Sequence, residues 1–181
     1  MNYSAAYLRS VAALKELEGG WGDHPGDPGR QTKFGISKLA YPDEDIFNLT
    51  WERAQFLYKR DYWDCMLLDA LRDERLAFEL FESSVILDAP GSSMRRAAKI
   101  AQAALILLGV DIKYDGIMGP QTIGALNAYP YKDALIKLMN GLELQTFLFG
   151  LGFEGEAIKL VRERLGQVKT FLRGWLRRIQ L

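Results

Sequence analysis

The chain has 181 residues, of which 49% are hydrophobic and 25% are charged, and its formal net charge is zero. This is an ordinary globular composition, long enough for one domain or two small ones, and the zero net charge gives no global sign of nucleic-acid or membrane binding. Cys65 is the single cysteine, which excludes an internal disulfide framework. No basic segment followed by a long apolar run opens the chain, so we expect no secretory signal and no transmembrane anchor.

Helix signals open the chain. Residues 4–18 start at Ser4, a favourable N-cap residue, and place apolar side chains on one face. Two glycines directly after Glu18 end this helix, and a loop rich in glycine and proline leads to the segment TKFGIS, which has the composition of a short strand. We therefore expect a small hairpin within about residues 22–37.

Further helices follow in the first half. Thr50 can cap a helix that reaches the segment RDYWD at residues 60–64, and residues 73–87 have the pattern of a very apolar helix. The segment DAPGSS at residues 88–93 is rich in turn residues and marks the clearest break in the chain.

The second half also has a helical pattern. MRRAAKIAQAALILLG, residues 94–109, predicts a helix that ends at a glycine, and Pro120 occupies the first turn of the next helix. Residues 132–149 predict another helix, interrupted by Gly141, and a last helix runs from about Glu156 to the end. The sequence thus predicts a mainly α fold with one small hairpin.

Glu18 lies where a general acid for glycoside cleavage could work. Such an acid must stay protonated near neutral pH, and both the partial negative charge at a helix C-terminus and an apolar wall from Trp21 favour the protonated form. Asp27 lies in a polar loop and could stay ionised to orient a water, which the Thr32 hydroxyl could also hold. A glutamate before two glycines is equally consistent with a solvated helix end, and Asp27 and Thr32 with turn hydrogen bonds. Spacing alone leaves both interpretations open.

The segment EGGWGDHPGDPGRQTKFGISKLAYP, residues 18–42, resembles the opening signature of glycoside hydrolase family 108, a family of phage and bacterial N-acetylmuramidases. The likeness continues through RDYWD and the helix with FESSV. DGIMGPQTIGALN and the terminal FLRGWLRR are similar to the family's peptidoglycan-binding region. The resemblance implies a mainly α, lysozyme-like fold. It also implies a catalytic muramidase region at residues 1–90 and a helical peptidoglycan-binding region at residues 94–181, as separate domains or as one compact unit.

The resemblance also implies site residues. Glu18 falls on the family's catalytic glutamate, and Asp27 and Thr32 are similar to the other two members of the Glu–Asp/Cys–Thr triad of T-even phage-type lysozymes, with one residue fewer before the threonine. Residues near Glu18 are expected to bind substrate: Trp21, Lys33, Phe34 and Gly35. The chain departs from the usual family residues Tyr, Gly, Asn and Asn at four positions: Trp21, Arg30, Lys33 and Ile86. No metal or cofactor is expected, and the single histidine, His24, excludes a histidine-rich metal site.

Positive charge is concentrated at the end of the chain. Residues 162–181 hold six Lys or Arg and one acid, a net charge of +5, so residues 1–161 sum to −5. This segment has the pattern of a cationic amphipathic helix, whose apolar stripe either packs into the bundle or lies on an anionic surface. We expect envelope binding through three arginines of this helix and peptidoglycan binding through two residues of DGIMGPQT: Arg173, Arg177 and Arg178, and Asp115 and Gln121.

Two functions remain at this stage. The first is an endolysin that hydrolyses the β-1,4 bond between N-acetylmuramic acid and N-acetylglucosamine. It would be made in the host cytoplasm without a signal peptide and released to the cell wall through a holin, and it would act as a monomer without nucleic acid. The alternative is a non-catalytic helical binding module that uses its basic C-terminal helix on anionic lipid or nucleic acid.

Overall fold

Helices dominate the described residues of this computed structural model, which are residues 3–18 and 31–149. The elements follow in this order: α1 (Ala5–Glu18), β1 (Thr32–Lys33), β2 (Ile36–Ser37), α2 (Trp51–Tyr58), the π-helical turn η1 (Lys59–Trp63), the 3-10 turn η2 (Leu68–Ala70), α3 (Glu74–Leu87), α4 (Arg95–Leu107), α5 (Pro120–Ala128) and α6 (Lys132–Phe149). The predicted mainly α, lysozyme-like fold with a small hairpin is confirmed. Among the helices of these segments, none is long and apolar enough to cross a membrane.

The predicted helix starts are confirmed, because each depends on local chemistry. The Ser4 hydroxyl accepts a hydrogen bond from the Tyr7 N–H at 3.2 Å, and the Thr50 hydroxyl accepts one from the Arg53 N–H at 3.2 Å. Both hydroxyls satisfy N–H groups that have no partner within the helix. Pro120 occupies the first turn of α5, where its missing N–H is not needed.

The segment TKFGIS forms a complete hairpin and not one strand. Thr32 and Ser37 are paired in an antiparallel register, and the two residues between the strands, Phe34 and Gly35, have φ angles of 54° and 75°. Two consecutive positive φ angles are what a tight two-residue hairpin turn requires. The hairpin is therefore confined to residues 32–37, and most of the remainder of the predicted 22–37 span lies outside the described residues.

One helix prediction is wrong. α6 continues through Gly141 without the predicted interruption. A Cβ placed on Gly141 would meet nothing within 4 Å, so this glycine marks an open face of the helix and not a break in its backbone. The predicted helix from Glu156 onward lies outside the described residues.

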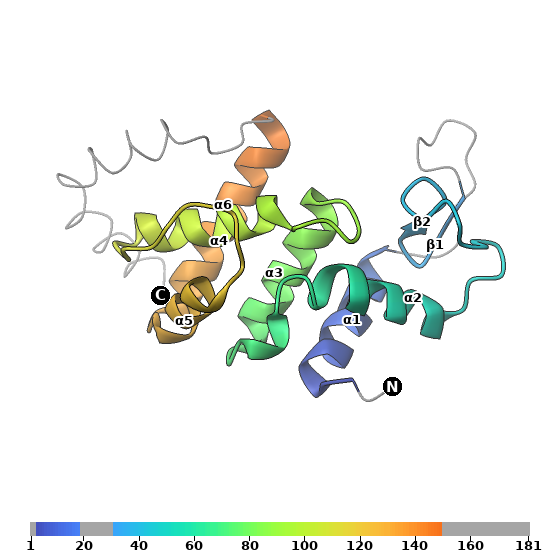
Figure 1. The fold of residues 1–181 in the computed structure, drawn as a ribbon, viewed down its shortest axis with the longest axis horizontal. Helices are drawn as coiled ribbons and strands as arrows, with labels where there is room; N and C mark the ends of the chain where they lie inside the picture. The colour runs from blue at the N-terminus through green and yellow to red at the C-terminus, as the bar shows by residue number, and fades with distance from the viewer. Residues whose placement is uncertain (1–2, 19–30, 150–181) are drawn as a thin grey trace.

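α3 is the central element of the molecule. Its Phe81 meets Trp63 edge to face at a centroid distance of 5.5 Å, and Trp63 meets Tyr7 of α1 at 5.2 Å; all three side chains are fully buried. Figure 1 shows α1, α2 and the hairpin on one side of α3, with α4, α5 and α6 on the other side. The core is continuous across α3, so the two sequence regions share it.

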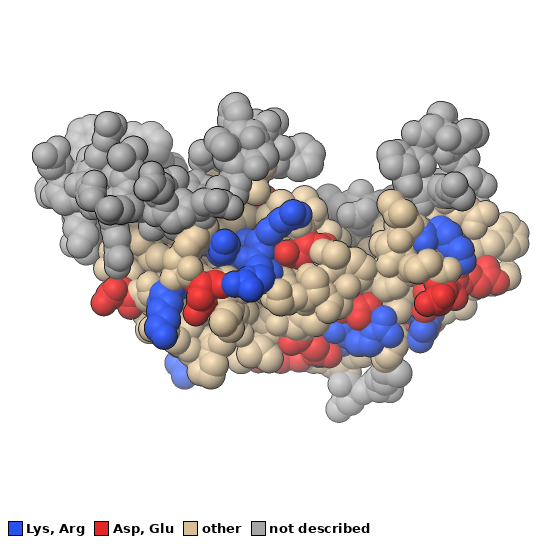
Figure 2. Space-filling view, turned by 45° about the horizontal axis from the view of Figure 1, so that its top comes forward, with Lys and Arg blue, Asp and Glu red and all other residues tan. Residues whose placement is uncertain are grey.

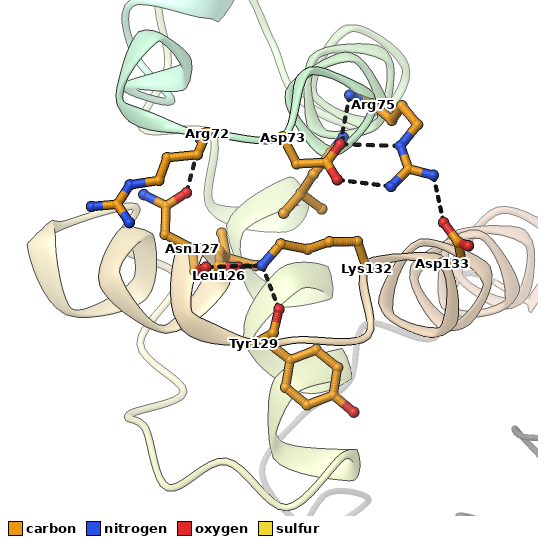
Figure 3. A network of polar contacts seen from close by, with 9 residues as sticks. Arg72, Asp73, Arg75, Leu126, Asn127, Tyr129, Lys132 and Asp133 are labelled. Carbon is orange, nitrogen blue, oxygen red and sulfur yellow. Dashed lines mark hydrogen bonds and ion pairs between the residues drawn. The ribbon is translucent and has the colours of Figure 1, made fainter.

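A polar network on the surface also joins the two regions. The Arg72 N–H donates to the side-chain oxygen of Asn127 in α5 at 2.9 Å. The Arg75 guanidinium bridges Asp73 of its own helix start, at 2.8 Å, and Asp133 of α6, at 2.5 Å. Figure 3 shows these contacts linking the start of α3 to α5 and α6.

Candidate active site

The last turn of α1 lies against the hairpin and the start of α2. The Lys15 ammonium is 4.6 Å from the centroid of the Trp51 ring and 5.6 Å from that of Phe34, and the two rings meet edge to face at 5.5 Å. α1 ends at Glu18, one turn after Lys15. Figure 1 shows α1 ending on the hairpin side of the molecule.

The hairpin residues predicted to bind substrate also hold the hairpin in place. The Lys33 ammonium donates to the carbonyl oxygen of Phe47 at 2.9 Å, which ties β1 to the loop before α2. The carbonyl oxygen of Phe34 accepts a hydrogen bond from the Tyr58 hydroxyl at 3.0 Å. Gly35 supplies the second positive φ angle of the turn. Thr32 is half-buried on β1, where its pairing with β2 fixes its position.

Several predicted site residues fall wholly or partly outside the described part of the structure. Glu18 is described only by its main chain. The following residues lie outside the described residues: Trp21, Asp27, Arg173, Arg177 and Arg178. Their predicted roles therefore stay predictions.

The segment DGIMGPQT wraps around a buried glutamine. The side-chain amide of Gln102 in α4 donates to the Asp115 carboxylate at 2.9 Å and to the Thr122 hydroxyl at 3.1 Å, and its oxygen accepts from the Gly116 N–H at 2.8 Å. The Asp115 carboxylate also accepts from the Ile117 N–H at 2.9 Å. These bonds hold the pKa of Asp115 below its usual value, and the bond from Gln102 has the largest effect.

The structure brings Asp115 and Gln121 together at one groove. This groove has a volume of about 440 Å³ and lies beside the segment that connects α4 to α5. Gln121 is exposed on the first turn of α5, whereas the Asp115 carboxylate accepts hydrogen bonds from Gln102 of α4 and from the Ile117 N–H of its own turn. The other residues that line the groove are Ile106, Asp111, Ile112, Lys113 and Tyr114.

Sequence reasoning missed the polar residues that organise these loops. Gln102 is fully buried in α4, and the one signal for it was a lone glutamine inside an otherwise apolar stretch. Arg60 and Asp61 belong to the segment RDYWD, which is part of the family resemblance. No sequence pattern, however, predicts the ion pair that they form in the π-helical turn.

The charge on the described surface is mixed. Figure 2 shows Lys and Arg side chains beside Asp and Glu side chains, without a large area of one sign on the face in view. Within residues 3–18 and 31–149, no group of three or more His, Cys, Asp and Glu side chains is placed to hold a metal ion. The described residues therefore offer hydrogen-bonding and packing surfaces and no metal centre.

Two family models match the chain. Residues 11–87 match the model of Glycosyl hydrolase 108, and residues 96–180 match the model of a Predicted Peptidoglycan domain. The first region belongs to glycoside hydrolase family 108. Together, the two matches support a glycoside hydrolase that acts on peptidoglycan.

The chain is also similar to a solved structure of SagA from Brucella abortus. The TM-score is 0.56 and the sequences are 23% identical, over 90% of this chain and 95% of that chain. This similarity shows a shared fold over nearly the whole length of both chains. A comparison with curated proteins gave no match.

Proposed function

We propose that this hydrolase is an N-acetylmuramidase with Glu18 as its general acid. The observation that carries the proposal is the position of Glu18 at the end of α1, one turn after a lysine that contacts both the hairpin and α2. Glu18 also lies within residues 11–87, which match Glycosyl hydrolase 108, and the resemblance of its segment to the family's opening signature supports a catalytic role for the carboxyl group. The endolysin role and the release through a holin stay predictions from the family resemblance.

The proposed reaction uses one proton donor and one held water. The Glu18 carboxyl gives its proton to the glycosidic oxygen as the bond from that oxygen to C1 of N-acetylmuramic acid breaks. The oxygen of a water bonds to C1, while Asp27 accepts the water's proton and Thr32 holds the water in position. The products are an N-acetylmuramic acid reducing end and an N-acetylglucosamine with a free 4-hydroxyl. Proton exchange with solvent restores both carboxyl groups.

The second region would hold the enzyme on its substrate. We propose that the groove lined by Asp115 and Gln121 binds peptidoglycan, supported by the match of residues 96–180 to a Predicted Peptidoglycan domain. The basic helix proposed for residues 162–181 would add attraction to an anionic envelope. Such binding is useful because an enzyme that stays bound to an insoluble polymer can cleave several of its glycosidic bonds before it dissociates.

Glu18→Gln tests the catalytic assignment. The amide keeps the shape of the side chain but has no acidic proton, so release of reducing ends from purified peptidoglycan should fall about 10²- to 10⁴-fold. Glu16→Gln is the matched control, because Glu16 is exposed on the same turn of α1 and should keep wild-type activity. Near wild-type release by Glu18→Gln would refute the role of Glu18. A wild-type protein that binds walls but releases no sugar would favour the non-catalytic binding module.

A further inference from the structure

A second cavity lies next to the hairpin, outside the residues assigned to catalysis. Its volume is about 380 Å³, within the range of roughly 300–1,000 Å³ that is usual for small-molecule sites. Three segments form it: the chain that leaves β2, the π-helical turn η1 and the loop between α3 and α4. The residues that line it are Ala40, Tyr41, Pro42, Asp43, Glu44, Arg60, Asp61, Pro90 and Gly91. We call it the Arg60 pocket.

The polar wall of the Arg60 pocket is rigidly built. The Asp61 side chain is only 8% exposed, and its two carboxylate oxygens accept from Nε and Nη2 of Arg60 at 2.5 and 2.7 Å. The Gly91 N–H donates to the Asp61 carbonyl oxygen at 3.1 Å, which holds the α3–α4 loop against η1. This two-point pairing fixes the plane of the guanidinium and uses two of its five N–H donors. Short π-helical segments such as η1 are frequent at functional sites.

Tyr41 supplies a buried hydroxyl to this pocket. The residue is 8% exposed, and its hydroxyl has no hydrogen-bond partner within the described part of the chain. Burial, together with nearby Tyr62 and Asp61, raises the pKa of Tyr41 far above its usual value, so the hydroxyl keeps its proton. Because buried polar groups normally have a partner, this donor is available to an acceptor that enters the pocket.

The charges of the Arg60 pocket favour a neutral ligand. Its carboxylates are Asp43, Glu44 and Asp61; Arg53 pairs with Glu44 and Arg60 pairs with Asp61. The Lys38 ammonium also donates to the Glu44 carbonyl oxygen at 2.8 Å, so the charges around the pocket balance and leave no excess positive charge for an anionic ligand such as the carboxylates of a stem peptide. A sugar that carries hydroxyl and acetamido groups can both donate to carboxylates and accept from Arg and Tyr donors.

We propose that the Arg60 pocket is a saccharide subsite that holds an N-acetylated sugar of the glycan strand, beyond the bond that is cleaved. The inference rests on the proposed muramidase function for the identity of the strand. The Tyr41 N–H donates to the carbonyl oxygen of Ser37 in β2 at 3.0 Å, so the pocket follows directly from the hairpin. A polymer that passes the hairpin can therefore reach the pocket. Pro42 and Pro90 give the pocket apolar walls against which a sugar ring can pack.

Binding of oligosaccharides of two lengths tests the subsite. The probes are the disaccharide and the tetrasaccharide of β-1,4-linked N-acetylglucosamine, titrated into full-length Glu18→Gln protein and followed by calorimetry and amide NMR. The tetrasaccharide should shift the Gly91 amide and the Arg60 Nε–H signals. Adding Tyr41→Phe should weaken tetrasaccharide binding by about threefold to tenfold, the usual effect of one lost hydrogen bond, and leave disaccharide binding unchanged.

Two further variants keep the test decisive. Asp43→Asn changes an exposed side chain, so it should fold even if Tyr41→Phe does not, and it should also weaken tetrasaccharide binding. Tyr131→Phe is the matched control, because Tyr131 is exposed at the start of α6. Wild-type affinity in both pocket variants, with no shift of the Gly91 amide, would overturn the subsite. Tetrasaccharide binding at the pocket by a chain that hydrolyses nothing would keep the subsite and refute the muramidase proposal.

Discussion

Asp115 and Gln121 line one groove but differ in what their side chains contact. The Asp115 carboxylate accepts hydrogen bonds from the Gln102 amide and from the Ile117 N–H, so it holds the turn between α4 and α5. Gln121 is exposed on α5. At the scale of single residues, two residues of one motif can therefore have different roles. The contacts indicate that Asp115 is structural and that Gln121 is available to a ligand.

These contacts predict different effects of two substitutions. Asp115→Ala should lower the free energy of unfolding by about 1–2 kcal/mol, because the buried Gln102 amide and the Ile117 N–H lose an acceptor. Gln121→Ala should leave stability unchanged and reduce retention on purified peptidoglycan. Denaturant unfolding and a pull-down assay measure the two quantities. If Gln121→Ala is retained like wild type, this face of the groove does not bind the wall.

α3 and α6 meet along a face that holds three carboxyl groups, those of Glu79, Glu82 and Glu143. Burial, and then the charges of Glu82 and Glu143, raise the pKa of Glu79 to about 7. The Asn140 amide donates to Glu79, and the Ser83 hydroxyl donates to Glu143 at 2.6 Å. At the scale of elements, this contact between helices is therefore sensitive to the protonation of Glu79.

The raised pKa of Glu79 predicts a pH-dependent stability. The folded protein binds this proton more tightly than the unfolded chain does, so its stabilising effect is complete below about pH 4.5 and is lost as the pH rises through about 7. Over this window wild type should lose more stability than Glu79→Gln, which cannot ionise. Denaturant titrations at several pH values measure the difference, with Glu52→Gln as the control, because Glu52 is an exposed residue of α2. Parallel stability profiles for wild type and Glu79→Gln would contradict the assignment.

Features set by neighbouring residues could be predicted from the sequence, and features set by distant contacts could not. The caps at Ser4 and Thr50 depend on a hydroxyl and an N–H three residues apart, so their pattern is visible in the chain. The interruption expected at Gly141 was wrong, because glycine weakens a helix but does not forbid one that packing supports. Gln102 and Tyr41 became candidates only when the fold placed them beside residues far away in the sequence.

At the scale of the whole molecule, α3 joins the region that matches Glycosyl hydrolase 108 to the region that matches a Predicted Peptidoglycan domain, through a shared core and the Arg75 network. The charge of the chain is unevenly distributed, at −5 over residues 1–161 and +5 over residues 162–181. The view in Figure 2 shows mixed signs on the described surface. Attraction to an anionic envelope would therefore come from the terminal segment.

Charge removal in the terminal segment tests this expectation. Replacing Arg173, Arg177 and Arg178 with glutamine should lower lysis of intact cells and spare hydrolysis of purified wall fragments, because each basic residue near an anionic surface contributes roughly 1 kcal/mol. Wild-type lysis should fall as salt rises, and lysis by the variant should fall less, because salt screens this attraction. Equal lysis with equal salt dependence would mean that these arginines do not act on the envelope.

The identity of the new reducing end is the most direct test of the proposed reaction. Purified peptidoglycan is digested with the wild-type protein, reduced with borohydride, hydrolysed and analysed for amino-sugar alcohols. Cleavage between N-acetylmuramic acid and N-acetylglucosamine predicts muramitol in the wild-type digest, and its near absence after treatment with Glu18→Gln. Glucosaminitol as the main product, or muramitol at wild-type levels from Glu18→Gln, would contradict the account.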